Sequence, residues 1–373
     1  MRKLRSYVLM LLAAVVLAAT GCERRPMEAD YVPTVRVIVK CDWQYFCEEP
    51  TGMTMYFFRD GEDTPRVIST SQVNDVAVNL PAGHWRMFLI NQSVYEFSSY
   101  EFFSMNKYAQ AFVRLAEIKS NWYVPSKIKS ISKETFIGHD PEHLAVALAS
   151  EFDITHEMVD HYQSAYYEYK TRLKSKAPDS ELDYYLSAMD EYTYVIPVTA
   201  RDIISTVRAR IYINNIRSLR SVRAALTGMA QNFVLTKDRT DEGDVDQLLE
   251  SWVVEFDEEV PTRGYIESQV TTLGLPNGVT SVEGRAPELN SLGLNMLMKD
   301  GKTLLKYDFL VGHKFQITKD ESGLGLRLNL YLQEGYDKDP VITLPDVVVE
   351  EGGGGFKADV VDWEDEINVG IPI

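Results

Sequence analysis

Residues 76–91 read VAVNLPAGHWRMFLIN, a segment that contains two strand patterns separated by a turn. Apolar side chains recur at every second position on both sides of the turn, at Val76, Val78 and Leu80 and then at Trp85, Met87 and Leu89. A period of two predicts β-strands that bury one face, and Pro81-Ala82-Gly83 supplies the turn residues. Two strands joined by a short turn, with no helix between them, indicate an antiparallel sheet.

The same period recurs along most of the chain. It is found at Val35, Val37 and Val39, at Met53, Met55 and Phe57, and at Val207, Ala209, Ile211 and Ile213. Further strand candidates are residues 252–256, 264–272, 302–311, 314–318 and 326–332. The chain is therefore predicted to be mainly β and to fold as antiparallel β-sandwiches.

Residues 141–190 lack this alternation, and helices are expected within them. Residues 155–174 contain few β-branched side chains and place Met158, Tyr162, Ala165 and Tyr169 on one helix stripe. A second short helix is expected at 181–190, with Ser180 as its N-cap. Roughly 350 residues follow position 22, which is too many for one hydrophobic core. We therefore expect a first β-sandwich domain at 31–150, a helical insertion or connector at 151–190 and a second β-sandwich domain at 191–373.

The N-terminus has the pattern of a secretory signal. Three basic residues precede an apolar run at 7–19, which is shorter than the about 20 residues that a membrane-spanning helix needs. Ala19-Thr20-Gly21-Cys22 follows and resembles the cleavage site of bacterial lipoproteins, with Ala19 where leucine is usual. We predict that residues 1–21 are removed, that Cys22 is acylated (palmitate among its chains) and that 22–30 form a tether. The alternative is an ordinary cleaved signal in which Cys22 is incidental.

The composition is strongly acidic. The formal net charge is -17, and removal of residues 1–21, with three basic and no acidic side chains, leaves 35 basic and 55 acidic side chains, a charge of -20. Such a charge argues against nucleic acid or anionic lipid headgroups as partners. Cys41 and Cys47 are six residues apart, about 20 Å along a straight strand and beyond the reach of a disulfide. Two free thiols and a disulfide across a turn at Gln44 both remain open.

No catalytic, cofactor or metal site is predicted. His139 and His143 are four apart, but Pro141 between them opposes a regular helix, and His156 and His161 are five apart, which separates them around a helix. The sequence contains no Gly-x-Ser-x-Gly motif, and the four glycines at 352–355 lack the Lys-Ser/Thr of a phosphate loop. We therefore expect a protein that is not an enzyme and has no cofactor.

The C-terminal residues 356–373 follow these four glycines. Phe356, Ala358 and Val360 alternate in the manner of a strand, and acidic residues follow them. Two interpretations remain open, because the glycines allow the segment to leave its own sheet. It is either a permanent edge strand of the second domain or a strand that takes part in subunit assembly.

Several of these segments together resemble the fimbrillin-type lipoproteins of Bacteroidales, especially their anchoring and accessory subunits. The resemblance rests on the lipoprotein-like start, the strands at 35–43 and 53–58, and Leu80-Pro81-Ala82-Gly83 with the apolar run that ends at Asn91. It extends to His139-Asp140-Pro141-Glu142, to the strands at 194–198 and 210–216, and to residues 221–236. The helical stretch is longer than is usual in that family.

The resemblance implies two transthyretin-like β-sandwich domains and a structural role. Members of the family build or anchor fimbriae by strand complementation, in which one subunit's extended strand fills a groove in its neighbour. We accordingly expect a lipid-anchored outer-membrane protein, exposed at the base of a fimbrium, whose partners are other fimbrial subunits. The residues after Cys22, Glu23-Arg24-Arg25-Pro26, do not form the strongly acidic run that resembles a surface-export signal in these bacteria. Retention in the inner leaflet of the membrane therefore stays possible. The alternative function is a surface lipoprotein that captures a glycan or another nutrient through exposed aromatic side chains.

Overall fold

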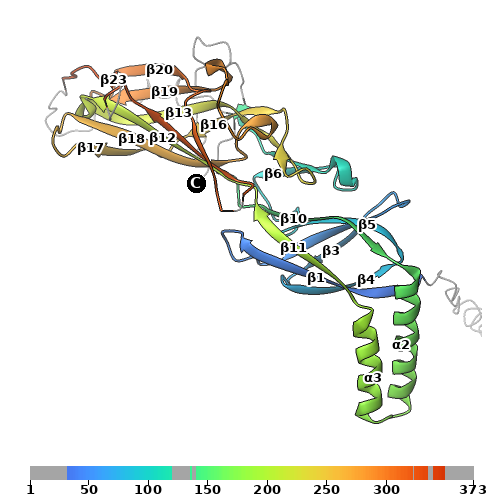
Figure 1. Ribbon diagram of the computed structural model, residues 1–373. Helices are drawn as coiled ribbons and strands as arrows, with labels where there is room; N and C mark the ends of the chain where they lie inside the picture. Colours follow the sequence, from blue (N-terminus) through green and yellow to red (C-terminus); the bar gives the residue numbers. More distant parts are fainter. Residues whose placement is uncertain (1–31, 120–134, 137–139, 322, 335–338, 349–373) are drawn as a thin grey trace, which may run out of the picture. The chain divides into compact units, whose positions relative to one another are not determined.

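The computed structural model describes residues 32–119, 135–136, 140–321, 323–334 and 339–348. The chain divides into two compact units (Figure 1). The smaller contains residues 1–35, 79–82 and 155–192, and the larger contains 36–78, 83–154 and 193–373. This division separates a helical unit from a β unit and does not test the predicted boundary between two β domains. The signal peptide, Cys22, the tether, His139 and residues 352–373 lie outside the described residues.

The helical unit contains two helices that lie side by side, α2 (His156–Lys174) and α3 (Asp179–Glu191) (Figure 1). The Thr155 hydroxyl accepts a hydrogen bond from the Met158 N–H at 3.2 Å and so caps α2. The predicted stripe from Met158 to Tyr169 is its half-buried face. The prediction of Ser180 as the cap of the second helix is wrong, because the chain turns into α3 at Pro178, whose ring presets a helix-compatible φ.

The β unit begins with a seven-stranded sheet in the order β3-β2-β5-β10-β11-β1-β4 among the described residues. Its strands are β1 (Thr34–Tyr45), β2 (Met53–Arg59), β3 (Arg66–Thr70), β4 (Asp75–Pro81), β5 (Gly83–Ile90), β10 (Ala145–Ile154) and β11 (Tyr194–Asp202). The strands expected around the Pro81-Ala82-Gly83 turn are thus confirmed as β4 and β5. Within the sheet, β1 and β11 pair in parallel, whereas β5 pairs antiparallel with both β2 and β10.

A six-stranded and a four-stranded sheet enclose buried apolar side chains, which belong to one cluster with side chains of the seven-stranded sheet. The first sheet contains β12 (Ser205–Asn214), β17 (Val253–Phe256), β18 (Arg263–Thr272), β21 (Gln316–Lys319), β22 (Leu326–Leu332) and β23 (Ile342–Thr343). The second contains β13 (Leu219–Ala230), β16 (Asp244–Leu249), β19 (Ser291–Met298) and β20 (Leu304–Leu310). The predicted apolar face of β12 is fully buried in this core together with side chains of β13 and β19. This arrangement is a β-sandwich and confirms the mainly-β fold class.

Short strands complete the described part of the β unit. A four-stranded sheet contains β6 (Tyr100–Phe103), β7 (Phe112–Leu115), β14 (Asn232–Val234) and β15 (Arg239–Thr240). A two-stranded sheet contains β8 (Ile118–Lys119) and β9 (Thr135–Phe136). Antiparallel pairing of β7 with β14 joins segments more than a hundred positions apart, Phe112–Leu115 and Asn232–Val234. Long-range pairing therefore binds the early and late parts of the chain into one unit.

Three features of the sheets differ from the sequence-based expectation. The strand β10 lies in the stretch without alternation and crosses the predicted boundary at 150/151 between the first β domain and the helical connector, because a register shift between Ala149 and Phe152 breaks its alternation. The strands β13, β16 and β19 escaped the period-two pattern because they are buried on both faces for much of their length. The strand β2 buries Thr54, Tyr56 and Phe58 as well as the predicted face. Burial on both faces removes the polar residues that would have marked a period of two.

Candidate functional site

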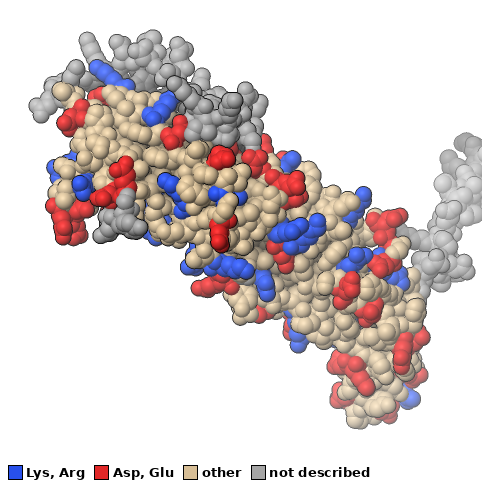
Figure 2. Space-filling view, turned by 45° about the horizontal axis from the view of Figure 1, so that its top comes forward, with Lys and Arg blue, Asp and Glu red and all other residues tan. Residues whose placement is uncertain are grey.

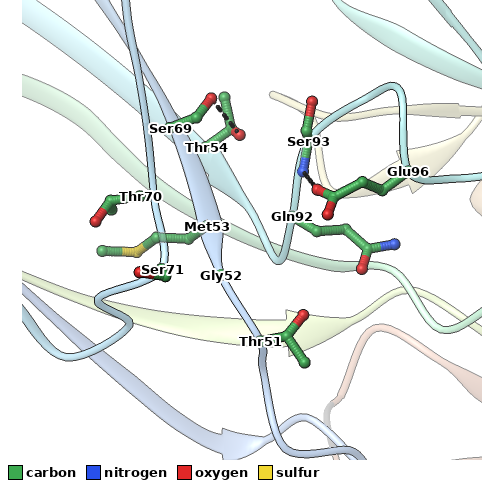
Figure 3. Close-up of a pocket in the computed structure, with 10 residues that line it drawn as sticks. All are labelled: Thr51, Gly52, Met53, Thr54, Ser69, Thr70, Ser71, Gln92, Ser93 and Glu96. Atoms are coloured by element: carbon green, nitrogen blue, oxygen red, sulfur yellow. Dashed lines mark hydrogen bonds between the residues drawn. The ribbon is translucent and has the colours of Figure 1, made fainter.

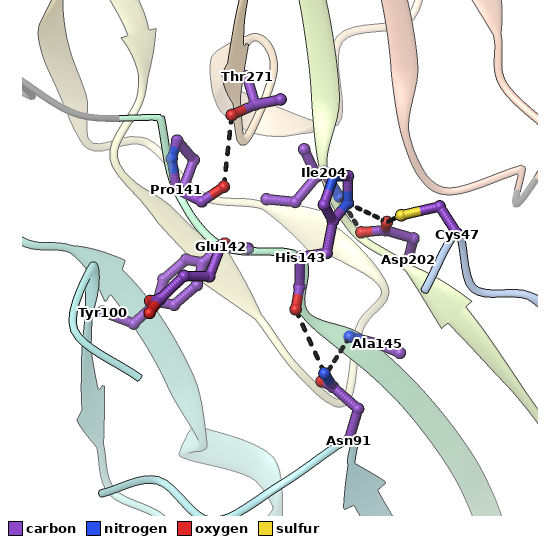
Figure 4. A network of polar contacts seen from close by, with 10 residues as sticks. All are labelled: Cys47, Asn91, Tyr100, Pro141, Glu142, His143, Ala145, Asp202, Ile204 and Thr271. Carbon is purple, nitrogen blue, oxygen red and sulfur yellow. Dashed lines mark hydrogen bonds and ion pairs between the residues drawn. The ribbon is translucent and has the colours of Figure 1, made fainter. Parts of the chain in front are cut away.

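Residues 140–143 connect segments from several parts of the β unit (Figure 4). The Glu142 carboxylate accepts hydrogen bonds from the backbone N–H and hydroxyl groups of both Ser98 and Ser99, at 2.6–3.2 Å. Partial burial opposes the charge of Glu142, but these hydrogen bonds outweigh burial and lower its pKa. The Tyr100 hydroxyl also donates to the Glu142 carbonyl, at 2.5 Å. Glu142 is therefore an ionised anchor that holds the segment in place.

His143 follows this anchor and lies beside a buried carboxylate. Its Nδ1 is 2.5 Å from Oδ2 of Asp202, whose side chain is 7% exposed. The Cys47 thiol donates to the same Oδ2 at 3.4 Å (Figure 4). The potential ligand atoms of these three side chains all lie within 4.8 Å of one another, and no other such group of three occurs among the residues that the structure describes.

Hydrogen bonds to neighbouring groups orient the Asp202 side chain and hold the backbone at His143. Asp202 Oδ1 accepts from the Ile204 N–H at 2.9 Å, which leaves Oδ2 toward Cys47 and His143. The side chain of Asn91 donates to the His143 carbonyl at 3.3 Å and accepts from the Ala145 N–H at 2.9 Å. The predicted strand end at Asn91 thus holds the position of His143 (Figure 4).

The cluster does not have the electrostatics of a cysteine nucleophile. Burial, followed by the charge and hydrogen bond of Asp202, raises the pKa of the Cys47 thiol to about 12. A thiol needs a lowered pKa to act as a nucleophile at neutral pH. The hydrogen bond to Asp202 also raises the pKa of His143, and its Nδ1 faces the carboxylate. The expectation that the protein is not an enzyme stays a prediction.

His156, His161 and Cys41 are not members of this cluster, and His139 lies outside the described residues. Both His156 and His161 are exposed on α2, and the ring of His161 stacks on Tyr192 with centroids 4.8 Å apart. Cys41 is buried and Cys47 is exposed, and both are free thiols, so the interpretation as two free thiols is the correct one. Sequence reasoning missed the cluster because positions 47, 143 and 202 have no local spacing that could indicate it.

A polar pocket of about 270 Å³ lies beside β2 and β3 (Figure 3). Six of its ten lining residues carry hydroxyls, and its remaining members are Gly52, Met53, Gln92 and Glu96. Two hydrogen bonds order the wall, between Thr54 and Ser69 at 2.9 Å and from the Ser93 N–H to Glu96 at 2.7 Å. Tyr95, in the same loop as Ser93 and Glu96, is 94% exposed. Hydroxyls, amides and an exposed ring suit a neutral polar ligand.

The edge strand β17 exposes three apolar side chains. Val253, Val254 and Phe256 are 59%, 38% and 53% exposed, and among the described strands β17 pairs with β18 alone. Other sheet edges are more polar: β21 exposes Gln316, Thr318 and Lys319, and β20 intersperses its exposed leucines with Lys306 and Asp308. Charged residues on an edge discourage pairing with a further strand. The edge of β17, which is apolar at three of its four exposed positions and carries Glu255 at the other, therefore marks a candidate pairing surface.

Acidic and basic side chains are interspersed on the face drawn in Figure 2, and this face has no large patch of a single charge. Among the described residues, no helix is both long and apolar enough to cross a membrane.

The β-sandwich fold of the chain is similar to that of a bacterial protein of known structure. A protein described as a “putative adhesin” from Bacteroides ovatus has 14% sequence identity and a TM-score of 0.52, and the alignment covers 88% of this chain and 99% of that one. Residues 21–250 match the family model described as a domain of unknown function, DUF5119, and the chain belongs to that family. No curated protein matches the chain in sequence.

Two further structural neighbours are fimbrial proteins of Porphyromonas gingivalis. The fimbrial anchor protein Mfa2 has 11% identity and a TM-score of 0.38, with 74% of this chain and 83% of that one covered. The tip fimbrial protein Mfa3 has 10% identity and a TM-score of 0.31, with 74% and 81% covered. The predicted resemblance to fimbrillin-type proteins is confirmed in that such proteins are the structural neighbours of this chain.

Proposed function

We propose that this protein is a structural subunit of a fimbrium and that strand β17 pairs with a strand of a neighbouring subunit. The apolar edge of β17 is the observation that carries the proposal. An unpaired edge supplies a row of backbone hydrogen-bonding groups, and alternate side chains determine the register of an added strand. The fold shared with a protein described as a putative adhesin supports the same role.

The proposal includes an anchor at the N-terminus. The lipoprotein-like signal and Cys22 support attachment to the outer membrane through acyl chains, with the β unit at the base of the fimbrium. One acyl chain binds a membrane only weakly and reversibly, whereas two or more hold a protein stably. Acylated Cys22 therefore accounts for retention of a protein whose partners are other subunits rather than lipid headgroups or nucleic acid.

The pairing surface can be tested by co-purification. The tagged chain is purified from outer membranes solubilised in detergent, and the subunits that accompany it are identified. We expect Val254→Lys with Phe256→Lys to abolish co-purification, because two like charges on one strand face oppose an incoming apolar strand.

The matched control is Leu304→Lys with Leu310→Lys on β20, an edge strand whose exposed face already carries charges. This variant should keep its partners, and both variants should melt near the wild-type temperature. Partners retained by the β17 variant would refute the proposed pairing surface.

The pocket in Figure 3 favours one second candidate function, capture of a glycan. Its hydroxyl and amide groups match the hydrogen-bonding groups of a neutral sugar, and Tyr95 offers a ring for stacking. This function would be supported if the protein bound a glycan on an array and Tyr95→Ala lost this binding. Co-purification of fimbrial subunits should be unchanged in that variant.

A further inference from the structure

Three different metal-binding side chains converge where β11 ends. The distances are 3.4 Å from Cys47 Sγ to Asp202 Oδ2 and 2.5 Å from His143 Nδ1 to the same oxygen. In tetrahedral zinc sites, with bonds of about 2.0–2.3 Å, neighbouring ligand atoms are roughly 3.3–3.8 Å apart. The sulfur already has this separation from the carboxylate, and the imidazole needs to withdraw by about 1 Å.

The chemistry of the donors selects the metal. Calcium and magnesium prefer oxygen ligands throughout, whereas zinc combines thiolate, imidazole and carboxylate. The cluster offers one of each. Cys47 and His143 both contact the same oxygen of Asp202, Oδ2. A single cation bound at this point could replace the protons of both donors.

Groups around the cluster orient it as they do in protein metal sites. The Ile204 N–H holds Oδ1 of Asp202, and Asn91 fixes the backbone on both sides of Leu144, through the His143 carbonyl and the Ala145 N–H. Such outer contacts preset the ligand geometry, and losing one typically costs 10–100-fold in metal affinity. Hydrogen bonds from neighbouring residues therefore hold the Asp202 side chain and the backbone of His143 in place before a metal binds.

We propose that Cys47, His143 and Asp202 bind one zinc ion, which clips together the three segments that carry them. The ion joins the segment after β1, the segment before β10 and the end of β11, which are distant in sequence. Cross-linking distant segments stabilises a fold by restricting the unfolded chain. This inference is independent of the proposed fimbrial role and replaces the expectation of no metal site, which considered only local histidine spacing.

The test uses the full chain, stripped of metal with a chelator. We expect one equivalent of Zn²⁺ in competition with a chromophoric chelator and a rise in melting temperature on zinc addition. With Co²⁺ as the probe, we expect visible bands of tetrahedral cobalt and a near-ultraviolet thiolate charge-transfer band. Cys47→Ser should remove the charge-transfer band although Cys22 and Cys41 remain, which assigns the thiolate.

Two variants make the test decisive. Cys47→Ser with His143→Gln should weaken zinc binding by more than about 100-fold, beyond the loss of an outer contact. His84→Gln is the matched control, because His84 lies 2.7 Å from Asp153 in a similar pair without a thiol, and it should bind zinc like the wild type. Metal-free melting temperatures show whether each variant folds. Absence of the thiolate band in the folded wild type, or zinc binding unchanged in the folded double variant, would overturn the proposal.

Discussion

Arg210 and Glu267 are direct partners across the antiparallel strands β12 and β18, and the Arg210 Nε donates to Glu267 Oε2 at 2.7 Å. Arg208 donates to the other carboxylate oxygen, also at 2.7 Å. The Arg210 guanidinium lies over the ring of Tyr265, 4.3 Å from its centroid. One carboxylate thus joins two arginines on the face of the sheet opposite the core, and its contribution can be measured.

We expect Glu267→Gln to lower the free energy of unfolding by about 1.5–3 kcal/mol, the range for a hydrogen bond to a charged group. Glu267 and Arg210 are only 20% and 22% exposed, so solvent screens them incompletely. Urea unfolding measures the change. Glu101→Gln, which breaks an exposed pair with Arg114, is the control and should cost less than about 1 kcal/mol. Equal costs for the two variants would contradict the argument.

The same carboxylate predicts a pH dependence. Burial would raise the pKa of Glu267, but the hydrogen bonds and charges of Arg208 and Arg210 outweigh burial and lower it below 4.5. A lowered folded-state pKa stabilises the protein above the unfolded-state value, and this stabilisation is lost as pH falls through the folded-state value. The difference in stability between wild type and Glu267→Gln should therefore be largest at neutral pH and shrink below pH 4.5. A difference that grows on acidification would refute this assignment.

Variants of two glycines with positive φ distinguish the cost of backbone strain from the cost of a steric clash. Gly228 has φ +70°, and a Cβ there would lie 2.1 Å from the Leu289 carbonyl oxygen, whereas Gly61 has φ +85° and open space around it. Gly61→Ala should cost about 1–2 kcal/mol from conformation alone. Gly228→Ala should cost more, because the backbone at Leu289 must also move. Thermal unfolding of the two variants tests the order, and equal melting temperatures would show that the chain absorbs the clash.

Adjacent residues of β5 test burial on both faces of its sheet. Phe88 and Leu89 point to opposite faces, and each is fully buried. We expect Phe88→Ala to cost about 3–5 kcal/mol and Leu89→Ala about 2–5 kcal/mol. Tyr95→Ala, at an exposed position, serves as the control and should change stability by less than about 0.5 kcal/mol. A small cost at Phe88 would mean that this face is less tightly packed than its burial indicates.

Cys22 is expected to be the acylated N-terminus. Cys22→Ser should release the protein from the membrane fraction, because the acyl chains provide its attachment. Fractionation with mass spectrometry of the mature N-terminus checks this. Cys41→Ser, at a free thiol elsewhere in the chain, should leave the protein in the membrane. Membrane retention of Cys22→Ser would exclude this anchor.

Local patterns were enough wherever one face of an element is buried and the other is exposed. The β12 alternation, the turn between β4 and β5 and the stripe of α2 were all predictable, because side-chain direction follows the period of the backbone. The strands β10 and β13 were not predictable in this way. A register shift interrupts β10, and both strands are buried on two faces over part of their length, which removes the polar positions of the pattern. A period of two is informative only when solvent covers one face.

The amino-acid sequence by itself determined the mainly-β class, the helical segment and the signal-like start, because these depend on neighbours in the chain. Only the tertiary structure decided which distant residues meet. The cluster of Cys47, His143 and Asp202 exists because β1 pairs in parallel with β11, while β11 pairs with β10 at Ala145 and Val146. Strand pairing between segments more than fifty residues apart is set by the packing of the whole sheet, and no local spacing encodes it.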